Sequence, residues 1–319
     1  ATTEIYTLSL HDALPIFKRA FASFRPDIVH THSGKAGFIG RLAAKRAGVP
    51  KIIHSIHGPS FGPFQGWATN ALFRGAERFA GRMTDHFVTV ADAMRDQYLD
   101  AGISQADDYT HIPSGFDLQP FFNAKNSPTK RASLGVSPGD FVVGKIARLF
   151  ELKGHDDLFA IAPRLAKRIP NIRFLLVGDG VLRGRFERLA KEIGCGQNFI
   201  FTGLVPPSEI PSLVGVMDAL VHLSRREGLP RALPQAMAAA KPVVAFDCDG
   251  AGEVCLDGKT GHLIEPGDLP KLEERLAKLA NDAPLRTALG QAGRKVVEEE
   301  FTVEQLVERQ YELYKRLLA

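Results

Sequence analysis

The pattern of apolar and polar positions divides the chain into two kinds of segment, which alternate along it. From residue 17 onward, short apolar runs follow longer segments in which apolar residues recur at helical spacing. The short runs predict buried strands, and the longer segments predict amphipathic helices. Strands and helices that alternate in this way predict an α/β protein built on doubly wound parallel sheets.

The expected elements fall into two halves. In the first half, strands are expected at residues 27–32, 51–57, 86–90 and 109–113, and helices at 17–24, 34–48, 67–83 and 92–101. In the second half, strands are expected at 141–147, 174–177, 199–202, 219–223, 242–246 and 261–264, and helices at 156–169, 269–279, 284–300 and 302–318. The last helix carries an apolar stripe of Val303, Leu306, Val307, Tyr314, Leu317 and Leu318, at the spacing that buries one face.

Two segments lie outside this alternation. Residues 1–16 lack a starting Met and a basic region before an apolar one, so a signal peptide is a poor interpretation. They resemble translated adapter sequence, and we expect a non-native leader there. Residues 126–140 are polar and rich in Pro and Gly, which predicts a linker. The expected domains are therefore 17–125 and 141–300, with residues 301–319 as a C-terminal helix.

Length and composition fit a globular protein with two cores. The 319 residues suffice for two α/β domains, and 45% are hydrophobic and 24% charged. No run of about 18 apolar residues predicts a membrane span. Cys195, Cys248 and Cys255 have no CxxC spacing, which favours a reducing compartment, the cytoplasm.

The charge is unevenly distributed. Residues 17–135 carry 15 Lys and Arg against 9 Asp and Glu, whereas residues 136–300 carry 22 of each kind. A basic first half predicts contact with an anionic acceptor or the inner face of a membrane, although an ordinary solvated face explains it equally well. Basic residues do not interleave with aromatic ones, so we expect no nucleic-acid partner.

The stretch from Ser224 to Asp247 combines a strand end, a loop and a helix in the order of a βαβ unit. Gly228 lets backbone approach a ligand closely, and Pro230 suits the start of a helix. The free N–H groups of a first helical turn attract phosphate. Glu227 beside them can accept hydrogen bonds from hydroxyl groups, so the stretch predicts a site for a nucleotide-activated sugar.

Two cations mark a second strand end. Arg148 follows the apolar run 141–147, and Lys153 lies in the loop before the next helix. Open α/β sheets bind ligands at such strand ends. A departing pyrophosphate needs positive charge already in place, and an Arg and a Lys provide it.

These motifs resemble glycosyltransferases of family 4, which have the GT-B fold. The resemblance rests on E-G-x-P at Glu227 to Pro230 with the following Ala-rich helix and K-P-V-V-A, on R-x4-K-G at Arg148 to Gly154, and on V-H-T-H-S with Lys35 nearby. It implies two Rossmann-like domains, the first incomplete because its opening Gly-rich βα unit is not found. It also implies a retaining, metal-independent hexosyltransferase that needs a nucleotide diphosphate sugar as substrate and no cofactor, and a glycan or lipid-linked acceptor.

The resemblance also implies roles for particular residues. Glu227 and His57 are the expected catalytic residues, and His32 and Lys35 lie on the acceptor side. Donor binding is expected from Arg148, Lys153, Gly228, Leu229, Pro230 and Gln235. The family normally has a second Glu at position 235 to bind the ribose, so Gln235 is a departure from its pattern.

Other interpretations remain open. Without the Gly-rich loop, the chain could be a catalytically impaired protein that only binds nucleotide sugars. A sugar-nucleotide epimerase is a further alternative, whereas a phosphorylase should carry a pyridoxal lysine motif that we do not find. The pairs His30/His32 and His54/His57 suggest zinc, but no Cys or carboxylate completes a ligand set at metal spacing, and we expect no metal. Gly178-Asp-Gly180 is a weak dinucleotide signal, and Asp247-Cys-Asp249 is expected to be a turn rather than a metal motif.

Overall fold

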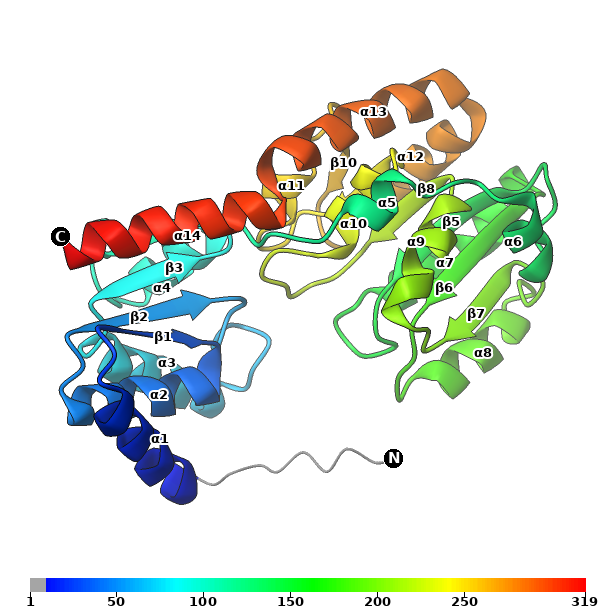
Figure 1. The fold of residues 1–319 in the computed structure, drawn as a ribbon. Coiled ribbons are helices and arrows are strands. Elements are labelled where there is room, and N and C mark those ends of the chain that lie inside the picture. Colours follow the sequence, from blue (N-terminus) through cyan, green and yellow to red (C-terminus); the bar gives the residue numbers. More distant parts are fainter. Residues whose placement is uncertain (1–9) are drawn as a thin grey trace. The chain divides into compact units, whose positions relative to one another are not determined.

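The computed structural model describes residues 10–319, which form two units. One contains residues 10–113 and 306–319, and the other contains residues 114–305. Each unit is built around its own parallel sheet, with four strands in the first and six in the second (Figure 1). The expected leader lies partly outside the described residues, and its last part, from Leu10, belongs to helix α1 (Leu10–Phe24).

The sheet of the first unit contains its strands in sequence order. They are β1 (Ile28–His32), β2 (Lys51–Ile56), β3 (His86–Thr89) and β4 (Tyr109–His111). In the register of β1 with β2, Thr31 lies opposite His54 and His32 opposite Ser55. All pairs are parallel, so the carboxyl ends of the four strands meet at one edge.

Helices cover both faces of this sheet. The connections are α2 (Gly34–Ala47), α3 (Trp67–Gly81) and α4 (Asp92–Asp100). Apolar residues of β2 alternate between faces, so Ile52 packs with Ala44 of α2 while Ile53 packs with Leu313 of α14 (Val303–Leu318). Figure 1 shows α2 and α3 on one side of the sheet and α14 on the other.

The apolar stripe predicted for the last helix is only partly correct. Leu306, Tyr314 and Leu317 pack on the sheet. Val303, Val307 and Leu318 are exposed instead. The most buried residue of α14 is Leu313, which the stripe omitted. The apolar spacing predicted the helix correctly, but it included residues near both ends that are exposed.

The second unit has the strand order β10-β9-β8-β5-β6-β7. The strands are β5 (Phe141–Ile146), β6 (Ile172–Val177), β7 (Phe199–Gly203), β8 (Ala219–His222), β9 (Val243–Phe246) and β10 (Gly261–Ile264). The direction of strand succession reverses between β5 and β8, which are neighbours although β6 and β7 come between them in sequence. Ligands of open α/β sheets bind beyond the carboxyl ends of the strands at such a reversal.

Two apolar cores lie on opposite faces of this sheet. On one face, Val143 and Phe174 pack with α7 (His155–Arg168), α8 (Arg183–Glu192) and α12 (Leu269–Asn281). On the other, Val142 and Leu175 pack with α9 (Ile210–Gly215), α10 (Ala232–Ala238), α11 (Ala251–Val254) and α13 (Ala283–Glu300). Helix α8 was not anticipated from the sequence, because only Phe186 and Ala190 are buried in it and the apolar signal is short.

The segment expected as a linker is folded. It contains α6 (Pro128–Ser133), and α5 (Gln119–Phe122) precedes it. Arg131 is buried and donates hydrogen bonds to the carbonyl oxygens of Ser137, Asp140 and Val216. Its polar composition therefore serves internal hydrogen bonds of the second unit. Across residues 10–319, none of the helices combines the length and apolar character needed to cross a membrane.

Candidate functional site

The second unit brings Lys153 and Glu227 together at the reversal of its strand order. Lys153 lies in the loop after β5, and Glu227 lies in the loop after β8. Lys153 Nζ is 2.6 Å from Glu227 Oε1, and the two side chains are only 20% and 21% exposed. The sequence separates these residues by 74 positions, and the adjacency of β5 and β8 joins them.

Neighbouring groups hold Glu227 in its charged form. His222 Nε2 lies 3.5 Å from Glu227 Oε1, and Lys153 Nζ also donates to Ser224 Oγ at 3.4 Å. Burial raises the pKa of Glu227, but the nearby His222 and the hydrogen bond and charge of Lys153 outweigh burial and lower that pKa to about 2. The site therefore presents a carboxylate beside a cation at neutral pH.

The backbone of the Glu227 loop is fixed by the loop that follows β9. Asp249 accepts a hydrogen bond from the Glu227 N–H at 2.7 Å, and Gly228 accepts one from the Gly250 N–H at 3.0 Å. Leu229 packs on the apolar core of α10. The Asp249 side chain thus accepts a hydrogen bond from the backbone of another loop, which is consistent with a strand-end turn at Asp247 to Asp249.

Arg148 and Gln235, which were also expected to bind the donor, have no hydrogen bond or ion pair to Lys153 or Glu227 among the described residues. Arg148 is exposed, and its guanidinium lies over the Phe150 ring, 4.9 Å from the centroid. Helix α10 begins at Ala232, two residues after the start expected at Pro230, and it is seven residues long. Pro230 instead accepts a hydrogen bond from the Leu233 N–H. Gln235 is half-buried in α10.

Gly154 lets the two loops approach each other. It has a φ of 66° and precedes α7. A Cβ at this position would lie 1.8 Å from the carbonyl oxygen of Leu223, just beyond β8. Only glycine therefore allows the Lys153 loop to pass this close to β8.

Several charged and polar groups near this site were not singled out from the sequence. Lys145 in β5 and His155 in α7 are both 2% exposed. Arg225 forms a bidentate ion pair with Asp157 of α7, with one Nη2–Oδ1 distance of 2.9 Å. Lys145 lies within the apolar run of β5 and was assumed to serve packing alone, whereas His155 and Arg225 lie in polar stretches where no motif marked them.

In the first unit, histidines cluster at the carboxyl ends of β1 and β2. His32 Nδ1 lies 2.9 Å from His57 Nε2, and the His32 ring stacks on His30 with a centroid distance of 4.4 Å. His30 also contacts Tyr314 Oη at 2.6 Å and Ser55 Oγ at 2.7 Å. The structure therefore joins two predicted residues, His32 and His57, and adds Tyr314, which was expected only as part of a packing stripe.

These imidazoles are held in their neutral form. Burial first, and the neighbouring His32 and His57 second, lower the pKa of His30 to about 3. Burial likewise lowers the pKa of His32 and of His57. His54 lies on the opposite face of β2, hydrogen-bonded to Thr31 Oγ1 at 2.9 Å. Neutral imidazoles can donate or accept hydrogen bonds, which suits contact with sugar hydroxyl groups.

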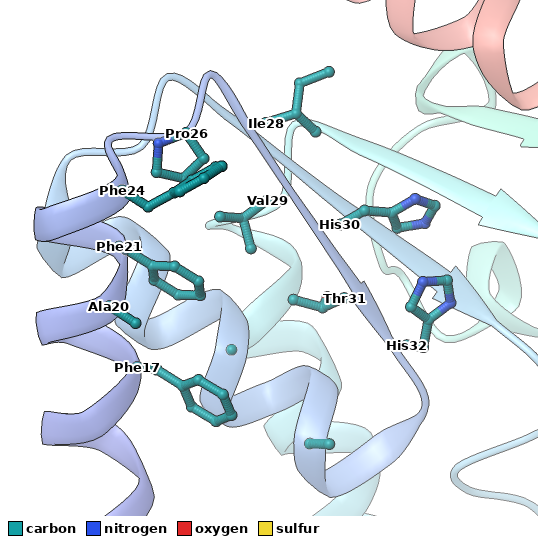
Figure 2. A pocket seen from close by; sticks show the side chains of 12 residues that line it. Phe17, Ala20, Phe21, Phe24, Pro26, Ile28, Val29, His30, Thr31 and His32 are labelled. Atoms are coloured by element: carbon teal, nitrogen blue, oxygen red, sulfur yellow. The ribbon is translucent and has the colours of Figure 1, made fainter.

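An apolar cavity of about 740 Å³ lies beside β1 in the same unit. Figure 2 shows Phe17, Phe21 and Phe24 of α1 on one side of it, and His30 and His32 on the far face of β1. Lys35, the other expected acceptor-side residue, is exposed in the first turn of α2. No hydrogen bond or ring contact among the described residues joins Lys35 to the histidine cluster.

Comparison with known proteins places both units in glycosyltransferase families. The model of the family "Glycosyl transferases group 1" matches residues 126–296. The model of "Glycosyltransferase Family 4" matches residues 7–120, beginning inside the segment that we expected to be a leader.

Two relatives illustrate the range of similar proteins. A GDP-mannose-dependent monoacylated alpha-(1-6)-phosphatidylinositol monomannoside mannosyltransferase from Corynebacterium glutamicum is 30% identical over 275 residues, covering 83% of this chain and 70% of that protein. A UDP-Gal:alpha-D-GlcNAc-diphosphoundecaprenol alpha-1,3-galactosyltransferase from Escherichia coli is 26% identical over 292 residues, covering 90% and 75%.

A solved structure has the same fold. HepE from Anabaena, in complex with UDP-glucose, superposes with a TM-score of 0.84 at 24% identity, covering 96% of this chain and 82% of that one. At this identity the likeness establishes the fold, which is the two-domain GT-B arrangement expected from the sequence motifs.

Proposed function

The chain belongs to family 4 of the glycosyltransferases, and from this membership we propose that it moves a sugar from a nucleotide diphosphate sugar to a glycan or lipid-linked acceptor. We further propose that the transfer retains the anomeric configuration and uses no metal. The observation that carries the proposal is the Lys153–Glu227 ion pair at the strand-order reversal of the second unit.

In this proposal the second unit binds the donor, chiefly through residues 141–300. Lys153 and Arg148 neutralise the charge that develops on the diphosphate as its bond to the sugar breaks. Glu227, kept ionised by its neighbours, accepts hydrogen bonds from the sugar hydroxyl groups. The backbone of Gly228 to Pro230 approaches the donor, and Gln235 bonds the ribose. A charged hydrogen bond of this kind contributes roughly 1.5–3 kcal/mol.

The first unit supplies the acceptor side, with residues 17–125 as its domain. His57 acts on the acceptor side, and His32 orients His57 through their 2.9 Å contact. Lys35 and the basic excess of residues 17–135 favour an anionic acceptor. This charge supports a cytoplasmic location with peripheral contact to the inner face of a membrane.

The relatives support the donor and acceptor classes without selecting a base. The Corynebacterium protein is named for GDP-mannose and a phosphatidylinositol mannoside, and the Escherichia protein is named for UDP-galactose and a diphosphoundecaprenol-linked sugar. We therefore propose a lipid-linked glycan acceptor and leave both UDP and GDP as candidate carriers.

The proposal is tested with a panel of UDP- and GDP-linked sugars. Binding is measured by calorimetry, and release of the nucleotide is measured with and without lipid-linked acceptors. Lys153→Ala should weaken donor binding by roughly 10- to 150-fold. Lys167→Ala is the matched control, because Lys167 is exposed at the other end of α7. NMR of the product should show the donor's anomeric configuration, and activity should survive EDTA.

The outcomes separate the alternatives. Tight donor binding with no turnover on any acceptor favours a protein that only binds nucleotide sugars. Equal donor affinity in the Lys153→Ala and Lys167→Ala variants would show that the diphosphate does not bind at the reversal of strand order between β5 and β8.

A further inference from the structure

Lys145 is a buried lysine at the carboxyl end of β5. It is 2% exposed and lies on the same face of the sheet as Val143, which packs in the core of α7. Within residues 10–319, no carboxylate lies within ion-pairing distance of its ammonium group. A buried charge without a counter-ion is costly, so its position below the donor loops requires an explanation.

Charged and titratable groups surround Lys145 from three directions. They are Lys153 from its own loop, His155 and Asp157 from α7, and His222, Arg225 and Glu227 from β8 and its loop. The residue opposite it on β6 is the apolar Leu176. Both carboxylates in this set are already paired, Asp157 with Arg225 and Glu227 with Lys153.

When Lys145 is protonated, the cluster has one positive charge in excess. Lys145, Lys153 and Arg225 are then cations, and Asp157 and Glu227 are the only anions among the groups that act on Lys145 in the described chain. Burial keeps His155 and His222 neutral, because it lowers the pKa of each. The Nδ1 atom of His155 is buried and has no hydrogen-bond partner among the described residues. The cluster thus lacks an anion.

We propose that Lys145 is a positioning residue of the donor site, whose buried amino group binds a proton when the donor arrives, because the donor's diphosphate then supplies the counter-charge that the ammonium form lacks. The inference rests on the proposed donor site at Lys153 and Glu227. In this inference Lys145 does not contact the donor directly and acts on it only through its charge.

The charge state of free Lys145 makes this coupling measurable. Burial first, and Lys153 second, lower its pKa to about 7, against the opposing effects of Asp157 and Glu227. An incoming dianion stabilises the charged form and raises that pKa. Protons are therefore taken up on binding above about pH 7, and donor affinity falls as pH rises through that range. Below about pH 6, Lys145 is already charged and uptake vanishes.

The experiment is calorimetry of the whole chain with UDP-glucose and GDP-mannose between pH 6 and pH 8.5. These probes are suitable because their diphosphates carry no group that titrates near neutral pH. At each pH the binding enthalpy is measured in phosphate and in Tris, whose ionisation enthalpies differ, and the difference gives the number of protons bound. We expect uptake to approach one proton per donor near about pH 8.

Two variants assign the proton. Lys145→Met has similar length and no charge, so uptake should disappear and affinity at pH 6.5 should fall about ten-fold. Lys145→Arg is permanently charged, so its affinity should stay constant with pH. Lys241→Met is the matched control, because Lys241 is a largely buried lysine that donates to the Gly215 carbonyl near the opposite ends of the strands. It should retain the wild-type uptake.

Each outcome is decisive. Donor binding without proton uptake in the wild type overturns the role of Lys145 and leaves the donor site standing. Proton uptake that persists in Lys145→Met, or that is centred below pH 6.5, would assign the proton to His155 or His222. Either result also overturns the role of Lys145. If neither nucleotide sugar binds the wild type, the proposed donor site is wrong and this inference falls with it. If Lys145→Met does not fold, the wild-type pH profile and Lys145→Arg decide.

Discussion

The two units place chemically different groups at the carboxyl ends of their strands. In the first, neutral imidazoles contact one another, as His32 and His57 do at 2.9 Å. In the second, charges of both signs meet, as Lys153 and Glu227 do at 2.6 Å. His32 and His57 are exposed residues, whereas Lys153 and Glu227 are mostly buried, and burial acts differently on the two sets. It suppresses the charge of the histidines, whereas pairing keeps Glu227 charged in spite of burial.

The difference follows from strand order. The described strands of the first unit succeed one another in sequence order, whereas the second unit reverses direction between β5 and β8. At such a reversal, the loops after the two neighbouring strands can present charges from both strand ends to one ligand. The charged groups of the second unit suit an anion, and the neutral imidazoles of the first unit suit uncharged hydroxyl groups. The following predictions test that division.

The largest effect is expected for Glu227→Ala. Removing the carboxylate takes away a charged hydrogen-bond acceptor and leaves Lys153 without its partner, so kcat/KM should fall roughly 100-fold. Initial rates over a range of donor concentrations measure this. Glu299→Gln, which removes an exposed carboxylate from α13, should leave the rate unchanged. A loss of less than three-fold in Glu227→Ala would place the sugar elsewhere.

Gly154→Ala should disrupt the second unit at its site. The new Cβ meets the Leu223 carbonyl oxygen, and the φ of 66° disfavours any side chain, so we expect a loss of more than about 1 kcal/mol in unfolding free energy. Urea denaturation measures the loss, and donor affinity should fall with it. Gly139→Ala is the control, since nothing lies within 4 Å of a Cβ there. Equal stability of the two variants would contradict the close packing of the loops.

His57→Asn should affect the first unit alone. Loss of the imidazole should lower kcat roughly ten-fold with donor affinity unchanged, because the donor is bound by the other unit. Rates at saturating donor and calorimetric affinities separate these quantities. His32→Asn should give a smaller change in the same direction, since it acts through His57. A change in donor affinity as large as the change in kcat would show that His57 also takes part in donor binding, and would contradict this prediction.

The acid response should separate the contribution of the histidines from that of Glu227 by pH range. The folded-state pKa values of His30, His32 and His57 lie below the ordinary value of 6.5. The unfolded chain therefore binds protons first, and the first unit should lose stability as pH falls below about 6.5. The pKa of Glu227 is also lowered, from 4.5 to about 2, so its contribution should persist down to about pH 4.5. Hydrogen exchange resolved by segment at pH 7 and pH 5 should show faster opening at pH 5 in residues 28–56 and also in residues 219–246, where burial lowers the pKa of His222. Unchanged exchange in both segments would contradict this prediction.

The smallest effect is expected for Gln235→Glu. A carboxylate accepts from both ribose hydroxyl groups, whereas the amide accepts from one and donates to the other. Donor affinity should therefore stay equal or rise by a few-fold, well within about 1.4 kcal/mol. Calorimetry with the best nucleotide measures it. A large loss would show that residue 235 does not face the ribose.

Much of this arrangement could be predicted from the sequence. Apolar periodicity located every strand of both sheets, because parallel strands buried on both faces give short continuous apolar runs. Motif spacing selected Lys153 and Glu227, which the structure joins. Lys145 and Tyr314 could not be identified, because a polar residue inside an apolar run gives no sign of which partner faces it. Their roles depend on tertiary pairing, of β5 with β8 and of α14 with β1 and β2.

The tether between Asp249 and the Glu227 amide has a practical consequence. Glu227, which we propose binds the sugar, is held by the side chain of Asp249 from a different loop, and Asp249 has a backbone φ of 50° that non-glycine residues seldom adopt. Exchanging residues 247–250 could therefore shift Glu227 by a fraction of its own width and leave every ligand-contacting side chain unaltered. Anyone who wants this scaffold to accept a different hexose could begin library construction there.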